Sequence, residues 1–158
     1  MTSFDRLLQC LSVAKVEFVI VGGVAAVAHG SARTTQDLDV VYSRDPTNLE
    51  RLVSALSPHK PYLRGAPPGL PFKFDLQTLR TGLNFTLTTS LGWIDLLGEI
   101  AGGFTYESLL ADSFEIEVLG VRCRLVSLET LIETKRAAGR PKDFESLAEL
   151  ELLRDQDK

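Results

Sequence analysis

Apolar and polar residues alternate along the first third of the chain with periods that predict helices and strands in turn. An apolar stripe at helical spacing predicts a helix over residues 3–14. Residues 16–21 are apolar on nearly both faces, which is typical of a central strand. The alanine-rich run 24–28 indicates a short helix, and residues 37–42 indicate a second strand. Helices and strands therefore alternate in this part of the chain.

The rest of the chain mixes helices with hairpins. Residues 58–71 hold five prolines and two glycines, so this stretch is expected to be an irregular surface loop. The remaining patterns predict a helix over 46–56, strands over 84–89 and 93–97, a short helix over 106–111, paired strands over 114–119 and 122–126, a helix over 127–138 and a last helix from Pro141. This order favours an α+β or mixed α/β fold over a doubly wound parallel sheet. The length favours a single domain over residues 1–158.

Composition narrows the classes of function. The chain has 158 residues, 44% of them hydrophobic, and a formal net charge of −4. This charge argues against a broad nucleic-acid-coating surface, although it leaves room for a local basic patch. Cys10 and Cys123 lie in apolar patterns without metal-binding spacing, which favours buried thiols in a reducing compartment. With no signal-peptide pattern and no apolar run of about 20 residues, the expected location is the cytoplasm, away from membranes.

The first candidate for chemistry is the run Asp37-Leu38-Asp39. Side chains on a strand alternate between its faces, so both carboxylates project from one face while Leu38 points into the core. Like charges at this spacing repel, and a divalent cation such as Mg²⁺ would remove the repulsion. Two acids at a solvated strand end are the alternative.

The second candidate is the Gly22-Gly23 pair between the first strand and the alanine-rich helix. Glycines at such a junction let an anion approach the backbone, and the following helix offers free N–H groups. A tight turn that needs positive φ is the alternative. The spacing fits neither a dinucleotide-binding fingerprint nor a Walker loop.

The third candidate is Asp95, within the apolar run 93–97. A carboxylate there is costly unless it is paired or bound to a metal. A strand-edge aspartate held by a hydrogen bond or an arginine is the alternative. If its strand lies beside that of Asp37 and Asp39, three carboxylates converge, and two metals about 4 Å apart could clamp a phosphoryl transfer.

Taken together, these motifs resemble those of the polymerase-β-type nucleotidyltransferase superfamily. Val21-Gly22-Gly23, a thirteen-residue spacer, Asp37-Leu38-Asp39 and a later strand aspartate, Asp95, follow its pattern. The run with His29-Gly30 and Arg33-Thr34 looks like small stand-alone bacterial members, including nucleotidyltransferase toxins of abortive-infection and toxin–antitoxin systems. The stretch from Leu128 to Asp143 also resembles theirs.

The resemblance implies transfer of a nucleoside monophosphate from an NTP, ATP among the candidates, to an acceptor hydroxyl with release of pyrophosphate. It implies that Asp37 and Asp39 hold two Mg²⁺ ions, with Mn²⁺ as a substitute. Asp95 would bind the metal nearest the acceptor and help deprotonate the attacking group. Gly22 and Gly23 would cradle the triphosphate. A tRNA, a protein hydroxyl or a small molecule are the candidate acceptors, and a partner protein and the oligomeric state are left open.

Two cations are candidate nucleotide ligands. Arg33 lies between the glycine pair and the acid strand, and Lys135 continues the apolar stripe of its helix, where a charge needs an anion. A surface or structural role for Arg33 and a snorkelling Lys135 are the alternatives. A basic group nearby favours either a phosphate-rich acceptor or simple solvation; its members are Arg136, Arg140 and Lys142. Asp143 is expected only to complement a helix dipole, and His29 to end a helix.

Two other functions remain open at this point. A catalytically silent nucleotide-binding or antitoxin-type module would keep the fold without turnover, although it would have no need of three repelling acids. A metal-dependent phosphodiesterase or nuclease would use the same acids but release a nucleoside monophosphate instead of pyrophosphate.

Overall fold

One mixed sheet organises the chain, which a computed structural model describes over residues 1–156. Its seven strands run in the order β3-β4-β5-β2-β1-β7-β6. Their bounds are Phe18–Val21 (β1), Asp37–Tyr42 (β2), Tyr62–Leu63 (β3), Phe85–Thr89 (β4), Gly92–Leu97 (β5), Ser113–Val118 (β6) and Val121–Val126 (β7). β1 is antiparallel to β2, whereas β2 pairs in parallel with β5 and β1 in parallel with β7. The predicted α+β class is confirmed.

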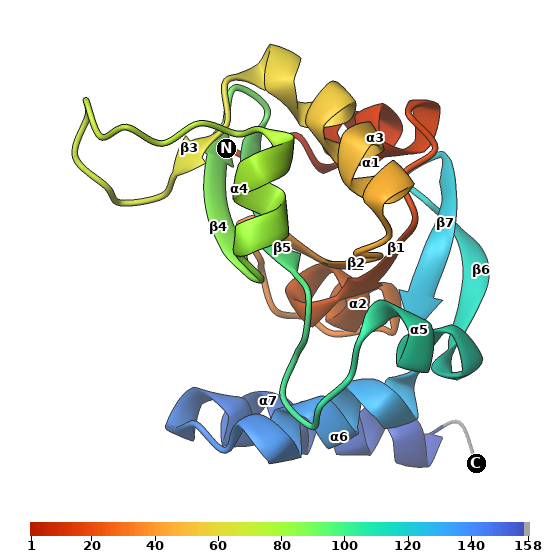
Figure 1. Cartoon of the computed structure of the whole chain (residues 1–158). Coiled ribbons are helices and arrows are strands. Elements are labelled where there is room, and N and C mark those ends of the chain that lie inside the picture. The colour runs from red at the N-terminus through yellow and green to blue at the C-terminus, as the bar shows by residue number, and fades with distance from the viewer. Residues whose placement is uncertain (157–158) are drawn as a thin grey trace.

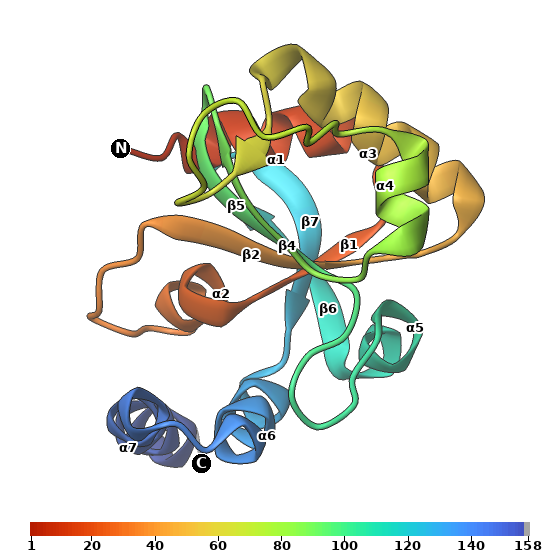
Figure 2. The ribbon, with the colours of Figure 1, turned by 60° about the vertical axis from the view of Figure 1, so that its left-hand side comes forward.

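Helices form a layer on each side of this sheet (Figures 1 and 2). Their bounds are Phe4–Val13 (α1), Gly22–Ala28 (α2), Pro46–Leu56 (α3), Leu76–Thr81 (α4), Tyr106–Leu109 (α5), Leu128–Ala138 (α6) and Pro141–Gln156 (α7). α1, α3 and α4 lie over one face, and α2 lies at the other, with the α6–α7 pair beyond it (Figure 2). Of the helices within residues 1–156, none combines the length and the apolar character needed to cross a membrane.

The period-two pattern of the central strands separates core from site. Leu38 and Val40 on β2, and Ile94 and Leu96 on β5, are fully buried. Burial of each such side chain stabilises the fold by roughly 1.5–3 kcal/mol. Residues between them point to the opposite face, toward α2. The core therefore fixes which side chains of β2 and β5 can form a site.

Helix ends follow the signals in the sequence. Asp45 precedes α3 and its side chain accepts a hydrogen bond from the Thr47 amide, while Ser127 does the same for the Thr130 amide in α6. α6 ends at Gly139, whose φ of 64° lies in the left-handed region. The α6–α7 pair is thereby connected by a short, sharply defined turn.

The structure differs from the expectations in three places. The stretch 58–71 is not wholly irregular, because it contains the edge strand β3, which pairs with β4. Helix α4 was not predicted, because six residues are too few to show a helical period; the side chain of Asp75 caps it. The first strand also begins later than expected, at Phe18, after Lys15 adopts a φ of 61°.

Candidate functional site

Strand pairing brings the three predicted carboxylates together. Asp39 on β2 lies opposite Asp95 on β5, and Asp37 is two positions from Asp39 on the same face. One carboxylate oxygen from each of the three lies within 4.8 Å of the others. β2 and β5 are parallel neighbours at the centre of the sheet, which is the arrangement that the three carboxylates need in order to converge.

Asp39 has the most perturbed carboxyl group of the three. Burial, followed by the charges of Asp37 and Asp95, raises its pKa to about 8. Its Oδ1 atom is buried without a hydrogen-bond partner. Burial also raises the pKa of Asp95, against an opposing effect of the Arg64 guanidinium. In the absence of a cation, a proton on Asp39 relieves the repulsion between the three carboxylates.

These features fit a hard divalent cation. Mg²⁺ and Mn²⁺ prefer carboxylate oxygens, and a cation would give the unpartnered Oδ1 of Asp39 a ligand in place of a proton. Asp37, Asp39 and Asp95 could together hold such an ion. The geometry does not distinguish Mg²⁺ from Mn²⁺, since both take the same oxygen donors.

Gly22 and Gly23 line the same site for a reason seen in the structure. Gly22 has a φ of 65°, and a Cβ atom built on it would overlap Oδ2 of Asp39. A Cβ on Gly23 would lie 2.5 Å from Oγ1 of Thr35. The two glycines therefore let the start of α2 approach the acid strand closely. Their role in cradling a triphosphate stays a prediction.

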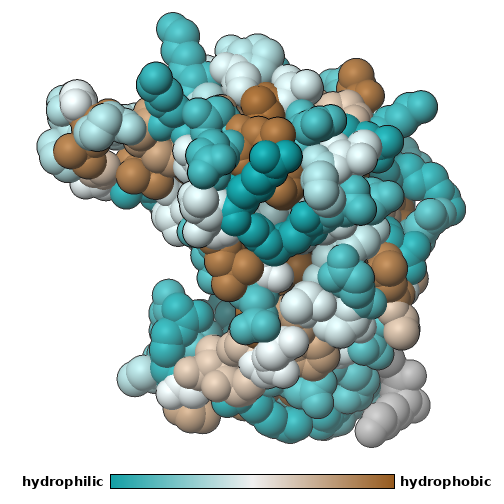
Figure 3. Space-filling view, in the orientation of Figure 1, coloured by the Kyte–Doolittle hydropathy of each residue, from teal (hydrophilic) through white to brown (hydrophobic). Residues whose placement is uncertain are grey.

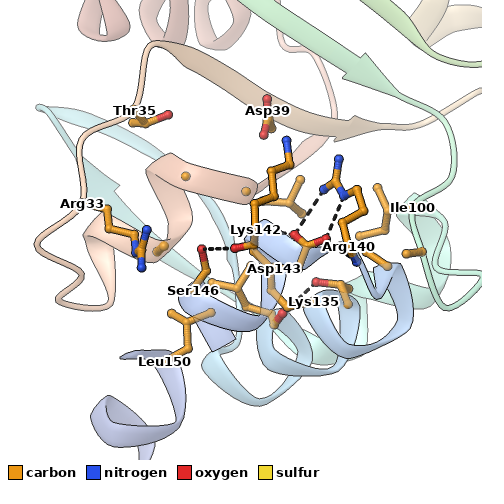
Figure 4. Close-up of a pocket in the computed structure, with 18 of the residues that line it drawn as sticks. Arg33, Thr35, Asp39, Ile100, Lys135, Arg140, Lys142, Asp143, Ser146 and Leu150 are labelled. Atoms are coloured by element: carbon orange, nitrogen blue, oxygen red, sulfur yellow. Dashed lines mark hydrogen bonds and ion pairs between the residues drawn. The ribbon is translucent and has the colours of Figure 1, made fainter. Parts of the chain in front are cut away.

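A cleft of about 680 Å³ separates the acids from the α6–α7 pair. In the space-filling view it opens between the loop that carries β3 and the two C-terminal helices (Figure 3). Lys135, Arg140 and Lys142 line its helical side, and Lys142 extends from α7 toward Asp39 (Figure 4). The strand wall is thus anionic, and the facing wall places these three cations among the acids Asp143, Glu145 and Glu149.

Asp143 organises the helical wall, and the expectation that it only complements a helix dipole was wrong. Its side chain is 1% exposed, accepts hydrogen bonds from Arg140 at 2.7 and 3.2 Å, and lies 3.5 Å from Nζ of Lys135. The Arg140 hydrogen bond holds the pKa of Asp143 below its usual range. Lys135 therefore has an anion within the chain, which the apolar stripe did not reveal.

Arg33 lies at the edge of the cleft and pairs with α7. Its guanidinium is 3.7 Å from Glu149 and 4.0 Å from Glu145, and half of its side chain is exposed. Glu149 also accepts hydrogen bonds from Ser31 and the Ala32 amide, which tie the loop before β2 to α7. Contact between Arg33 and a nucleotide stays a prediction. His29 hydrogen-bonds the Val126 carbonyl, in line with its expected place at a helix end.

Arg64 is the residue of the site that the sequence did not reveal. It follows β3, and its guanidinium lies 2.7 Å from Asp95 and 3.8 Å from Asp37. It also stacks on Trp93, with Cζ 4.8 Å from the ring centre. An arginine within a proline-rich loop carries no periodic signal, so only the unexplained charge of Asp95 indicated that such a partner was needed.

Comparison with known proteins supports the fold. Neither a protein-family model nor a curated protein sequence matches the chain. The solved structures that are similar to it include a Thermotoga maritima protein described provisionally as a nucleotidyltransferase, and an antigenic nucleotidyltransferase-like protein from Paracoccidioides brasiliensis. The first has a TM-score of 0.56 at 16% identity and covers 90% of this chain and 86% of its own. The second has a TM-score of 0.50 at 16% identity and covers 95% and 77%.

Identities this low establish the architecture alone. The chain has a nucleotidyltransferase-like fold, as the resemblance of its motifs implied. The relation to abortive-infection and toxin–antitoxin members finds no counterpart in these two structures and stays a prediction.

Proposed function

We propose that this chain is a metal-dependent nucleotidyltransferase that transfers a nucleoside monophosphate from an NTP to an acceptor hydroxyl and releases pyrophosphate. The observation that carries the proposal is a cleft with three converging carboxylates on one wall. The other wall carries three cations, Lys135, Arg140 and Lys142, among the acids Asp143, Glu145 and Glu149. A triphosphate in this cleft would contact the divalent cation on one side and the cationic side chains on the other, so its negative charge would be balanced from both sides.

The chain's own residues divide into three tasks in this proposal. Asp37 and Asp39 hold the divalent ion, which when bound neutralises charge that develops on the phosphate. Lys135, Arg140 and Lys142 bind the non-bridging oxygens of the phosphates. Each supplies N–H donors for an anionic oxygen.

Asp95 has the third task, to accept the proton of the attacking hydroxyl. Burial raises the pKa of its carboxyl group, which suits a general base better than an ordinary surface aspartate. Asp143 acts through its neighbours, because its hydrogen bonds fix where Arg140 points.

A transfer assay with NTPs labelled at the α-phosphate tests the proposal. The label should move to an acceptor while pyrophosphate is released. Asp39→Asn should lower the rate roughly a thousandfold, as expected for loss of a metal ligand. Asp112→Asn is the matched control, because Asp112 is exposed, and the hydrogen bond it makes within residues 1–156 involves its backbone carbonyl, which accepts from the Ser127 amide.

Two results would decide against transfer. Release of labelled nucleoside monophosphate in place of pyrophosphate would identify a phosphodiesterase or nuclease. Metal-dependent NTP binding in calorimetry, with no turnover on RNA, protein or small-molecule acceptors, would identify the silent nucleotide-binding module.

The acceptor and the biological setting belong to the same proposal. With a tRNA acceptor the transferred label becomes sensitive to ribonuclease, whereas with a protein hydroxyl it becomes sensitive to protease. Growth arrest on expression, relieved by Asp39→Asn, would support a toxin or phage-defence role. Normal growth would contradict it.

A further inference from the structure

Arg64 is held in place by contacts that do not involve the acids. Its backbone amide donates to the Thr86 carbonyl at 3.0 Å, and its Nη2 donates to the Leu87 carbonyl at 2.8 Å. The ring of Trp93 supports the guanidinium from one side. Stacking and a carbonyl acceptor orient an arginine well, so its position is built by the edge of the sheet rather than by attraction to the carboxylates.

From this position Arg64 reaches two of the three acids. Nη2 lies 2.7 Å from Oδ1 of Asp95, and Nη1 lies 3.8 Å from Oδ2 of Asp37. Only 18% of the Arg64 side chain and 18% of the Asp95 side chain are exposed, so the pair is largely shielded from water. Asp39 differs, because its buried Oδ1 has no partner.

The formal charges of this group balance with one divalent ion. Asp37, Asp39 and Asp95 contribute three negative charges when ionised, and Arg64 contributes one positive charge, which leaves two negative charges. One divalent cation cancels them. A second ion beside Asp95 would have to lie against the guanidinium, where like charges repel strongly at low dielectric.

We infer that Arg64 takes the place of a second metal ion, so that the centre binds one divalent cation on Asp37 and Asp39 with Arg64 as the fixed cation of Asp95. This inference rests on the proposed function and replaces the two-metal arrangement that the family resemblance implies. Arg64 is then the residue that sets the metal stoichiometry of the site.

Mn²⁺ binding followed by electron paramagnetic resonance tests the inference without any turnover. The wild-type protein should bind one Mn²⁺ with an isolated-ion spectrum. Arg64→Gln should bind two, the second at least tenfold more tightly than any second ion of the wild type, with the spin coupling of two neighbouring ions. Trp93→Leu is a second variant, which should loosen Arg64 and strengthen the second ion by a smaller factor. Arg6→Gln, at an exposed position on α1, is the matched control and should bind one ion.

Two coupled ions in the wild type would overturn the inference and leave the proposed function intact. One ion in both Arg64→Gln and Trp93→Leu, with both variants shown to be folded by thermal melting, would overturn it as well. No Mn²⁺ in any form, with or without added NTP, would contradict metal dependence itself and thus the proposed function.

Discussion

The two walls of the cleft differ in how their charges are satisfied. On the strand side, three carboxylates repel one another, and Asp39 keeps a buried oxygen without a partner. On the helical side, Asp143 gathers Lys135 and Arg140 into a closed group of ion pairs. Within residues 1–156, the buried side-chain atoms without a hydrogen-bond partner are Oδ1 of Asp39 and Nε of Arg64, and both belong to the strand wall.

This difference indicates at which wall a ligand gains the most binding free energy. A cation that binds the strand wall relieves repulsion and displaces a proton, so the wall is organised for something that the chain does not supply. On the helical wall Lys135 and Arg140 are already paired, so an anion that binds them must compete with Asp143 for the same donors. Metal binding is therefore expected to depend steeply on single atoms of the strand wall, whereas phosphate binding should depend weakly on any one cation.

Gly22→Ala should have the largest effect, because a Cβ atom would overlap Oδ2 of Asp39 and the residue has positive φ. We expect Mn²⁺ binding to be lost and the free energy of unfolding to fall by more than the roughly 1 kcal/mol that positive φ alone costs. Gly120→Ala separates the two effects, since Gly120 has a φ of 81° and open space around it. Calorimetry and urea unfolding measure both. Equal losses in the two variants would contradict the packing of Gly22 against Asp39.

Changing the pH should have the next largest effect on the strand wall. Asp39 must lose a proton to bind a metal, and its pKa is raised to about 8, first by burial. Mn²⁺ affinity should therefore increase roughly fiftyfold from pH 6 to pH 8, as the ionised fraction does. Calorimetric titrations across this range measure the increase. A pH-independent affinity would show that Asp39 is not the titrating ligand.

Stability of the ion-free protein should change in the opposite direction. The folded state holds the Asp39 proton more tightly than the unfolded state, whose pKa is near 3.8. The contribution of this proton to the free energy of unfolding is fully present below about pH 4, and it is lost as the pH rises through about 8. Urea unfolding from pH 5 to pH 9 measures the decline, which Asp39→Asn should reduce.

Asp143→Ala should have an intermediate effect on the helical wall. The change removes charged hydrogen bonds to Arg140 and the contact to Lys135, so the free energy of unfolding should fall by about 1.5–3 kcal/mol. Glu115→Ala is the matched control, because its pair with Arg122 is exposed and worth under about 1 kcal/mol. Denaturant unfolding compares them. Equal losses would mean that Asp143 does not organise this wall.

Arg33→Gln should have the smallest effect. Its guanidinium is half exposed and pairs with Glu149 at 3.7 Å, so the loss in stability should stay under about 0.5 kcal/mol. The affinity for an NTP, measured by calorimetry with Mn²⁺ present, should fall no more than about fivefold. A loss far greater than this would show that Arg33 is a principal phosphate ligand.

The strand wall could be predicted from the sequence because its logic is local. A two-residue period places Asp37 and Asp39 on one face, and an acid in an apolar strand identifies Asp95. The glycine pair marks the junction before α2. The sequence did not predict that β2 and β5 are neighbours, and their parallel pairing in the structure brings the three acids together.

The rest depends on contacts between segments that no local pattern connects. Arg64 acquires its role from the pairing of β3 with β4 and from the ring of Trp93, neither of which the proline-rich stretch indicated. Asp143 looked like an ordinary acid in a first helical turn, and its burial arises where α7 packs against α6. An ion pair between distant segments does not change the hydrophobic periodicity of either segment, so the sequence pattern does not reveal it.

The parallel pairing of β2 with β5 also bears on the order in which the protein folds. β6 and β7 meet through a short turn, whereas Asp39 and Asp95 come from strands that are separated by α3 and α4. Long loops close slowly because their chain entropy is lost before any contact forms. The metal centre thus does not exist until this long-range pairing has formed, and Mn²⁺ added during refolding would bind only chains in which the pairing is complete.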